Sequence, residues 1–326
     1  MTQLYPLRLE PICRPKPWGG WRLTDPEHED FPPGVQIGES WEVSDYPGQE
    51  TVVANGELAG TPLRHLVAER TAELVGSESI LQAGRLPLLV KYLNAGETLS
   101  VQVHPDNAYA AEHENGFGKR EAWYIMRADP GAKLIREVTP GTTRETFRQA
   151  LDKRQLEPCL HVFEPKAGDV VMIDWGTVHA IGKGILLAEI QQTSDITYRV
   201  YDWNRVNEDG EPRKLHVKEA LDVTVFDQHT PDTCERKLLS DRGDGWCEGA
   251  RCDEFVIEII ELAGAVEDAP PPGRFLILNV VRGHAVLEDG EKPMTLRTGA
   301  SVLIPACVSR YTLRSDDATV LRSYVP

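Results

Sequence analysis

The chain has 326 residues, of which 41% are hydrophobic, and a formal net charge of -16 at pH 7. This composition is typical of a globular protein with a substantial core, arranged as one large or two moderate domains. The negative charge repels nucleic acid and membrane surfaces, so we expect neither as a partner, and a phosphorylated ligand requires a local basic pocket.

We expect no targeting signal at the start of the chain. Residues 5–11 mix charged residues with prolines, so we expect neither a signal peptide nor a transmembrane helix, and we expect a cytoplasmic location.

The cysteines have no two-residue spacing, which argues against a zinc knuckle or a redox pair. We expect all six to be reduced: Cys13, Cys159, Cys234, Cys247, Cys252 and Cys307.

Most of the chain predicts short strands separated by glycine, proline and aspartate, and helices are few. Strand-rich sequence with frequent turns predicts a β-sandwich or barrel, here with a small helical layer. The clearest predicted strands cover residues 50–54, 88–93, 99–103, 170–173 and 185–191. The predicted helices run from Thr61 and Pro62 to Leu74 with the threonine as cap, over 144–153 with Thr142 or Thr143 as cap, and over 216–221.

Two segments, 168–175 and 299–306, share one design: a glycine, an apolar strand, and then a polar or proline turn. We interpret them as two copies of one barrel element, although chance similarity of two hairpins is an alternative. Eleven residues after the glycine, the first copy has His179 and the second has Arg310. A polar segment near 226–249 separates the two copies. Together with the missing histidine in the second copy, it predicts a catalytic domain over 1–226 and a domain without metal ligands over 227–326.

One group of residues is suited to a metal ion. Gln102 and His104 are two residues apart on a predicted strand, so both project from the same face. Glu121 begins another apolar strand, and His179 follows a turn into the next. Two imidazoles, a carboxylate and an amide oxygen suit zinc, tolerate manganese or cobalt, and leave a position open for catalysis. The alternative for His104 is a buried histidine that only hydrogen-bonds a neighbour.

With these residues the sequence resembles a known family, the type I mannose-6-phosphate isomerases of the cupin superfamily, in their shorter bacterial form. The resemblance implies two cupin-like (jelly-roll) β-barrels and a metal-dependent enzyme that interconverts mannose 6-phosphate and fructose 6-phosphate. The matching segments, in order, are 17–20, 38–42, 87–93, 99–106, 119–121, 168–180 and 189–203.

The resemblance also implies roles for individual residues. The family's ligands for one zinc ion fall on Gln102, His104, Glu121 and His179. Its active-site arginine falls on Arg199, an acidic residue of the same pocket falls on Glu189, and groups for substrate binding and proton transfer fall on Lys91, Ser100 and Lys119. Trp18, in the first matching segment, is expected to form a wall of the pocket or part of the core.

The implied reaction moves a proton between carbon 2 and carbon 1 through a cis-enediol, so it needs a group with a pKa near neutrality. Lys119 meets this need if Arg120 lowers its pKa, and Glu189 does if burial raises its pKa. Ser100 projects toward the side of Gln102 and His104, where its hydroxyl suits a phosphate. Each of these residues also has a purely structural alternative. Arg199 forms an ion pair with Asp195 or Asp202, and Glu189 forms one with a nearby lysine. Lys91 lies on a solvated strand edge.

Two other functions remain open at this point. A cupin dioxygenase shares the barrel and the histidines but favours iron. A catalytically silent sugar-phosphate-binding cupin shares the whole scaffold. For the isomerase, the expected partner is a small-molecule hexose 6-phosphate, and the protein is expected to be a monomer or a weak homo-oligomer.

Overall fold

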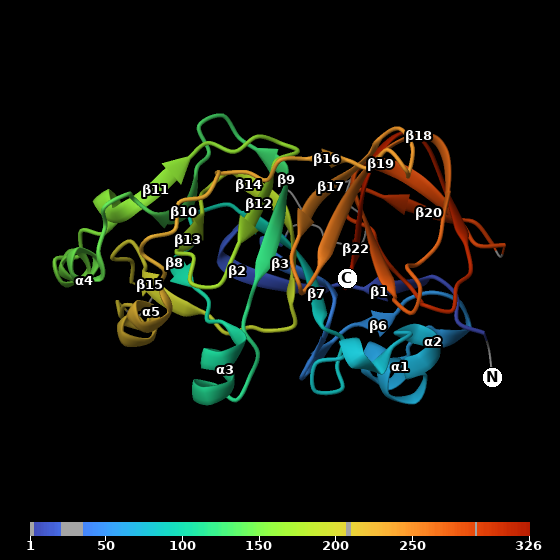
Figure 1. The fold of residues 1–326 in the computed structure, drawn as a ribbon, viewed down its shortest axis with the longest axis horizontal. Coiled ribbons are helices and arrows are strands. Elements are labelled where there is room, and N and C mark those ends of the chain that lie inside the picture. The colour runs from blue at the N-terminus through green and yellow to red at the C-terminus, as the bar shows by residue number, and fades with distance from the viewer. Residues whose placement is uncertain (1–2, 21–34, 207–209, 291) are drawn as a thin grey trace.

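The structure is a computed structural model that describes residues 3–20, 35–206, 210–290 and 292–326. It is mainly β, with two barrels side by side and short helices beside them (Figure 1). The prediction of a mainly β fold with a small helical layer is confirmed.

The first barrel consists of two antiparallel sheets. The six-stranded sheet has the order β12-β9-β14-β7-β2-β3, and the five-stranded sheet has the order β11-β10-β13-β8-β15. Their strands are β2 (Ile12–Gly20), β3 (Ile37–Val43), β7 (Leu88–Ala95), β8 (Val101–Val103), β9 (Glu121–Ala128), β10 (Leu134–Val138), β11 (Leu160–Phe163), β12 (Val170–Ile173), β13 (His179–Ile181), β14 (Ile185–Gln192) and β15 (Tyr198–Tyr201).

The second barrel is built on a nine-stranded sheet of order β16-β17-β18-β22-β19-β21-β1-β6, with β20 beside β19. Strands β1 and β6 come from the beginning of the chain, and Leu7 of β1 lies opposite Leu303 of β21. Residues near the N-terminus therefore add two strands to the second barrel. The predicted boundary between the two domains, at 226/227, stays a prediction. The strands are β1 (Leu7–Glu10), β6 (Val52–Val53), β16 (Lys237–Leu238), β17 (Trp246–Arg251), β18 (Val256–Asp268), β19 (Leu276–Glu288), β20 (Met294–Arg297), β21 (Ser301–Ile304) and β22 (Tyr311–Tyr324).

The six-stranded sheet is buried on both faces, and this positions the site. On β7, Val90 and Tyr92 join the large apolar core that includes Ile257 and Ile277 of the second barrel. Because successive strand residues point to opposite faces, Lys91 and Leu93 project into the interior of the first barrel. Every inward position of β7 and β14, the two central strands of this sheet, is therefore cut off from solvent.

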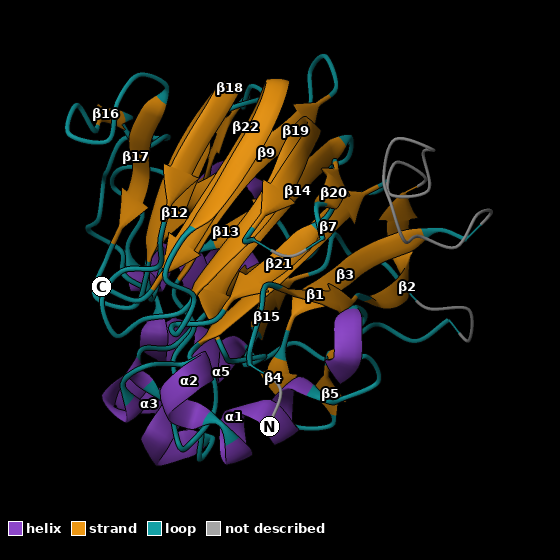
Figure 2. Cartoon of the chain, turned by 90° about the vertical axis from the view of Figure 1, so that its right-hand side faces the viewer, coloured by secondary structure: helices purple, strands orange, loops and turns teal. Residues whose placement is uncertain are grey.

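The helices gather mostly at one end of the strands (Figure 2). Thr143 caps its helix with a capping box, as predicted. The prediction that Thr61 caps the first helix is wrong, because Pro62 is the N-cap residue and makes no side-chain hydrogen bond there. The single helix predicted up to Leu74 is two helices, which meet at Arg70. The helices are α1 (Leu63–Glu69), α2 (Thr71–Leu74), α3 (Asn107–His113), α4 (Arg144–Asp152) and α5 (Val217–Val223), with 3-10 turns at Gly56–Leu58, Glu78–Ile80 and Glu157–Cys159; a two-stranded ribbon joins β4 (Asp45–Tyr46) to β5 (Gln49–Glu50).

Helix α3 has no counterpart among the predicted elements. The Asp106 side chain accepts a hydrogen bond from the backbone N–H of Tyr109 and so caps the helix. The aspartate directly after Pro105 was the available signal for it.

All six cysteines are free, as expected. Among the described residues, none of the helices combines the length and apolar content needed to cross a bilayer.

Candidate active site

The inner face of the five-stranded sheet carries a row of polar residues. Arg136 lies opposite His179 in strand register, and His179 lies opposite Gln102. Arg199 follows on the other side of Gln102. Because directly opposed residues project from the same face, all four side chains leave the sheet on one side.

The six-stranded sheet carries a second row that faces the first. Glu189 on β14 lies between Lys91 on β7 and Trp123 on β9. Glu121 is the first residue of β9, two positions before Trp123, so it projects from the same face. Residues from opposite sheets thus share the interior of the barrel.

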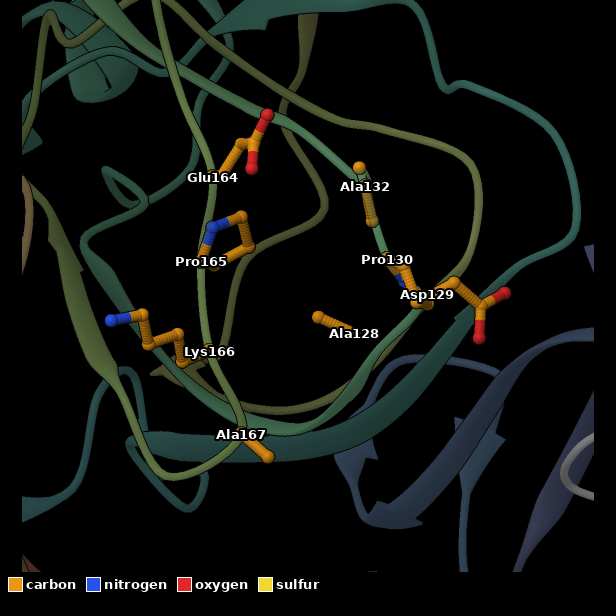
Figure 3. A pocket seen from close by; sticks show the side chains of 9 residues that line it. Ala128, Asp129, Pro130, Ala132, Glu164, Pro165, Lys166 and Ala167 are labelled. Atoms are coloured by element: carbon orange, nitrogen blue, oxygen red, sulfur yellow. The ribbon is translucent and has the colours of Figure 1, made fainter.

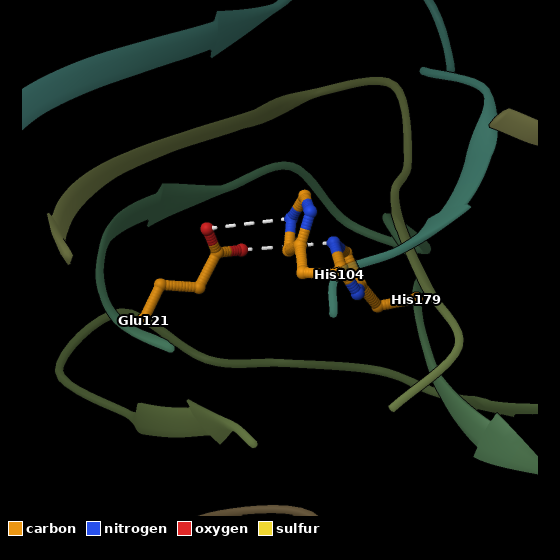
Figure 4. Close-up of side chains that lie close together, drawn as sticks. All are labelled: His104, Glu121 and His179. Atoms are coloured by element: carbon orange, nitrogen blue, oxygen red, sulfur yellow. Dashed lines mark ion pairs between the residues drawn. The ribbon is translucent and has the colours of Figure 1, made fainter. Parts of the chain in front are cut away.

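His104, Glu121 and His179 meet between the two sheets. His104 Nε2 lies 3.6 Å from Glu121 Oε2, and His179 Nε2 lies 3.6 Å from Glu121 Oε1 (Figure 4). One ligand atom from each residue lies within 4.8 Å of the others, and all three side chains are fully buried. The structure therefore brings together three of the four predicted metal ligands, which come from separate stretches of the chain.

Both imidazoles present a lone pair to this cluster. His104 Nδ1 lies 2.9 Å from the Ile196 carbonyl oxygen, and His179 Nδ1 lies 2.9 Å from that of Thr177. A carbonyl only accepts, so each proton is assigned to Nδ1 and each Nε2 lone pair points inward. Burial lowers the pKa of His104 well below its usual range and lowers the pKa of His179 to about 4, so both rings are neutral at pH 7.

The cluster fits a divalent cation. Among the described residues, His179 Nε2 is a buried acceptor without a hydrogen-bond partner, and such an atom is costly unless a ligand satisfies it. Neutral imidazoles with a carboxylate are ligands that zinc prefers. Gln102 stands beside His179 in register, and its binding to the metal stays a prediction.

Lys119 lies against the cluster. Its Nζ is 2.6 Å from Glu121 Oε2 and 3.7 Å from Glu189 Oε1. Burial lowers the pKa of Lys119, but the two carboxylates outweigh burial and raise the pKa above its usual range. The prediction that Arg120 lowers this pKa is wrong, because the Arg120 guanidinium turns away to Asp174 and Glu254, each at 2.8 Å. Lys119 is therefore positively charged in this arrangement.

Glu189 and Lys91 form the next pair along the sheet. Burial, followed by the charge of Glu121, raises the pKa of Glu189, in the direction expected from the sequence. Lys91 Nζ lies 3.7 Å from Glu189 Oε1, 3.8 Å from Asp195 Oδ1 and 4.4 Å from the centre of the Trp41 ring. Lys91 is only 3% exposed, so it is not on a solvated strand edge.

Arg199 contacts Ser100 at the less buried side of the site. Its Nε donates to Ser100 Oγ at 3.4 Å, and its Nη1 donates to the Lys214 carbonyl oxygen at 3.1 Å. The nearby Asp202 is occupied by Arg205 and Arg213, each at 2.5 Å. Within residues 3–20, 35–206, 210–290 and 292–326, no carboxylate forms an ion pair with Arg199, so its charge is free to meet an anionic ligand.

Comparison with known proteins decides the family. A model described as "Phosphomannose isomerase type I, catalytic domain" matches residues 7–130, and one described as "Mannose-6-phosphate isomerase, cupin domain" matches residues 249–325. The mannose-6-phosphate isomerase of Streptococcus mutans is 36% identical over 95% of this chain and 96% of its own length. The chain belongs to the type I phosphomannose isomerases.

Solved structures agree with this family. The mannose 6-phosphate isomerase from Bacillus subtilis superposes with a TM-score of 0.87 at 31% identity, covering 98% of this chain and 99% of that one. A putative mannosephosphate isomerase from Archaeoglobus fulgidus reaches a TM-score of 0.78 at 21% identity, covers 100% of this chain and 99% of its own, and shows the fold alone. The resemblance and the two-barrel cupin fold are confirmed, and neither the dioxygenase nor the silent binding module is favoured.

Within this phosphomannose isomerase, Trp18 packs in the interior of the first barrel. It is 8% exposed and shares an apolar cluster with Leu93 and Leu99. This matches the core alternative considered for Trp18, and contact with substrate stays a prediction.

Two residues that contact the predicted site residues were not predicted from the sequence. Trp123 Nε1 donates to Glu121 and Glu189, and Asp195 lies beside Lys91. The two-residue spacing of Glu121 and Trp123 on one strand was a usable signal for the first. Asp195 lies outside the strands, and no periodicity pointed to it.

Two cavities of the described part of the structure lie away from this site. One of about 300 Å³ lies at the far end of β9 from Glu121, between residues 128–132 and 164–167 (Figure 3). Another, of about 750 Å³, lies between residues 3–6 and the second barrel. Neither of these two cavities is lined by a predicted site residue.

Proposed function

We propose that this chain interconverts mannose 6-phosphate and fructose 6-phosphate at one divalent metal ion, with zinc as the physiological metal. Gln102, His104, Glu121 and His179 are its proposed ligands. The observation that carries this proposal is the pair of neutral imidazoles whose Nε2 atoms face one buried carboxylate, each at 3.6 Å. Family membership supports the same reaction.

The proposed reaction transfers a proton between carbon 2 and carbon 1 of the open-chain sugar through a cis-enediol. A bound divalent cation supplies a positive charge for the oxygen that becomes negative in the transition state. Lys119 and Glu189 are the proposed proton-transfer pair, since Nζ and Oε1 are 3.7 Å apart and both groups lie beside the metal ligands. Their burial excludes the water that would otherwise compete for the proton.

Arg199, Ser100 and Lys91 are the proposed substrate-binding groups. An acidic protein needs local positive charge to hold a phosphorylated sugar. Arg199 offers a guanidinium already hydrogen-bonded to Ser100 Oγ, and a guanidinium with a hydroxyl is a suitable pair for phosphate oxygens. Arg199 also places a fixed charge in register with Gln102, next to the proposed metal. Lys91 contributes positive charge from the opposite sheet.

The proposal extends to the domains and the location. We propose that residues 1–226 carry out the reaction in the cytoplasm and that 227–326 hold no metal. In support, the single group of three or more histidine, cysteine or acidic residues able to hold an ion, in the part of the chain that the structure describes, lies in the first barrel.

Metal removal tests the proposal directly. We expect dialysis against a chelator to abolish the formation of fructose 6-phosphate from mannose 6-phosphate in a coupled assay, and zinc to restore it. Recovery with a panel of zinc, manganese, cobalt and iron identifies the preferred metal. Full turnover by protein shown to be metal-free contradicts the proposal. Substrate binding without exchange of the carbon-2 hydrogen with solvent indicates a silent module instead.

A further inference from the structure

Trp123 contacts three residues of the site, although the proposed reaction assigns it no role. Its side chain is fully buried. The indole Nε1 lies 3.1 Å from Glu121 Oε1 and 3.2 Å from Glu189 Oε2, and it donates its single proton to both. The indole ring meets the His179 ring edge to face, with centroids 5.5 Å apart.

This shared hydrogen bond constrains how Glu121 faces the two histidines. Glu121 Oε1, which accepts from Trp123, is the oxygen nearest His179 Nε2, and the other oxygen lies near His104 Nε2. Together with the contact of Lys119 Nζ to the other oxygen at 2.6 Å, this hydrogen bond restrains rotation of the carboxylate about its last side-chain bond. Partners behind a ligand orient it in this way and increase its affinity for the metal.

The same N–H also reduces the repulsion between two buried carboxylates. Glu121 and Glu189 project into one interior that excludes water, and like charges there oppose each other strongly. The Lys119 ammonium, 2.6 Å from Glu121 Oε2 and 3.7 Å from Glu189 Oε1, offsets part of this repulsion. The Trp123 N–H, which donates to the other oxygen of each carboxylate, offsets a further part. Without it, we expect Glu189 to move away from Glu121 and from the 3.7 Å contact with Lys119.

A second Glu-x-Trp segment shows what is particular to Trp123. On β3, Trp41 Nε1 donates to Glu39 Oε2 at 2.9 Å, again two residues along one strand. The Trp41 indole donates to this one carboxylate. The Trp123 indole donates to a second carboxylate because β14 places Glu189 opposite Trp123 in strand register.

We propose that Trp123 is a positioning residue, which holds the Glu121 carboxylate for metal binding and the Glu189 carboxylate for proton transfer. The proposal rests on the proposed function, since it assigns those tasks to the two glutamates. Trp123 acts only through them and requires no contact with substrate.

Replacing the N–H donor tests this role. Trp123→Phe keeps an aromatic ring beside His179 but removes the donor. We expect its zinc affinity, measured by competition with a chromophoric chelator, to fall roughly 10- to 100-fold. In zinc-saturated protein we expect kcat to fall while KM stays within about twofold, because binding groups are untouched. A folded variant with unchanged zinc affinity and unchanged kcat overturns the proposal.

A second replacement separates hydrogen bonding from packing. Benzothienylalanine at position 123 keeps the shape of tryptophan and exchanges only the N–H for sulfur, so it serves even where phenylalanine prevents folding. We expect the same loss of zinc affinity from it, and a wild-type affinity overturns the proposal. The matched control is Trp246→Phe, at an equally buried tryptophan of the second barrel, which is expected to leave zinc affinity unchanged. An equal loss in that control contradicts a specific role.

A double mutant links Trp123 to Glu189. In a Glu189→Gln background, the fall in kcat caused by Trp123→Phe is expected to shrink while the fall in zinc affinity persists. Full additivity in kcat overturns the part of the proposal that concerns Glu189. A wild-type protein that neither holds zinc nor turns over substrate defeats the proposed function instead, so the two failures are distinguishable.

Discussion

The two barrels share an architecture but fill their interiors differently. Inside the first barrel, Glu121, Glu189 and His179 are buried among apolar side chains. The second barrel encloses an apolar cluster that includes Leu278 and Val302, and its buried charges are paired: Arg322 lies 2.9 Å from Glu258 and 2.8 Å from Asp268. Both barrels therefore hold buried charges in contact with opposite charges, as buried ions require. What distinguishes the first barrel is that it brings two imidazoles to one buried carboxylate.

The difference is visible within the repeated element. Gly168 and Gly299 have φ of 93° and 92°, and each precedes a four-residue strand, β12 or β21. Glycine adopts this left-handed conformation without strain, so the turn is maintained in both copies. His179 then begins β13 inside the first barrel, whereas Arg310 is exposed before β22. The two copies therefore differ at this position, which holds a buried histidine of the candidate metal cluster in the first barrel and an exposed arginine in the second.

Loss of a predicted ligand is the strongest way to break this comparison. His179→Ala is expected to remove the metal and to lower kcat by roughly 10³-fold or more, since charge stabilisation by the cation is worth several kcal/mol. Metal analysis and the coupled assay measure both. The barrel is expected to remain folded by circular dichroism, because its apolar core is intact. The control is His284→Ala, at an exposed histidine of the second barrel. Full activity of His179→Ala contradicts the assignment of His179 as a metal ligand.

The arginines at the two barrels provide the next test. Arg199→Ala is expected to retain its metal and to lose roughly 10²-fold in kcat/KM for mannose 6-phosphate, the usual cost of removing one charge-stabilising donor. Arg310→Ala, at the exposed arginine of the second barrel that matches His179 in the repeated element, is expected to change neither. Loss of metal from Arg199→Ala identifies a structural arginine, contrary to its proposed role.

The last expected effect concerns acid stability and not turnover. Burial raises the pKa of Glu39, but Lys91 and Lys16, with a hydrogen bond from Trp41, outweigh burial and lower the pKa to about 2. A carboxyl with a depressed folded-state pKa stabilises the fold above its unfolded value of 4.5 and loses that contribution as pH falls toward about 2. The difference corresponds to about 3 kcal/mol.

Glu39→Gln is therefore expected to flatten the dependence of unfolding free energy on pH between 4.5 and about 2, as measured by urea titration. Glu288→Gln serves as the matched control, at a carboxylate of the second barrel that pairs with Arg314 at 3.1 Å. An unchanged slope in Glu39→Gln shows that the charged interior of the first barrel does not account for its acid sensitivity.

The sequence by itself determined the strands and the residues that bear chemistry. Strand period placed Gln102 and His104 on one face, the glycines marked the turns, and Glu121 and His179 stood at strand beginnings. These features depend on neighbours within a few positions, so local spacing is sufficient to predict them.

Only the tertiary structure decided which groups meet. Glu121 comes from the six-stranded sheet and His104 and His179 from beside or within the five-stranded one, and their approach depends on how two sheets pack. The same holds for Lys119, whose charge is set by two carboxylates rather than by Arg120, and for Trp123, whose indole reaches Glu189 across a strand. Such contacts join positions far apart in the chain, and no local pattern specifies the register or the packing that creates them.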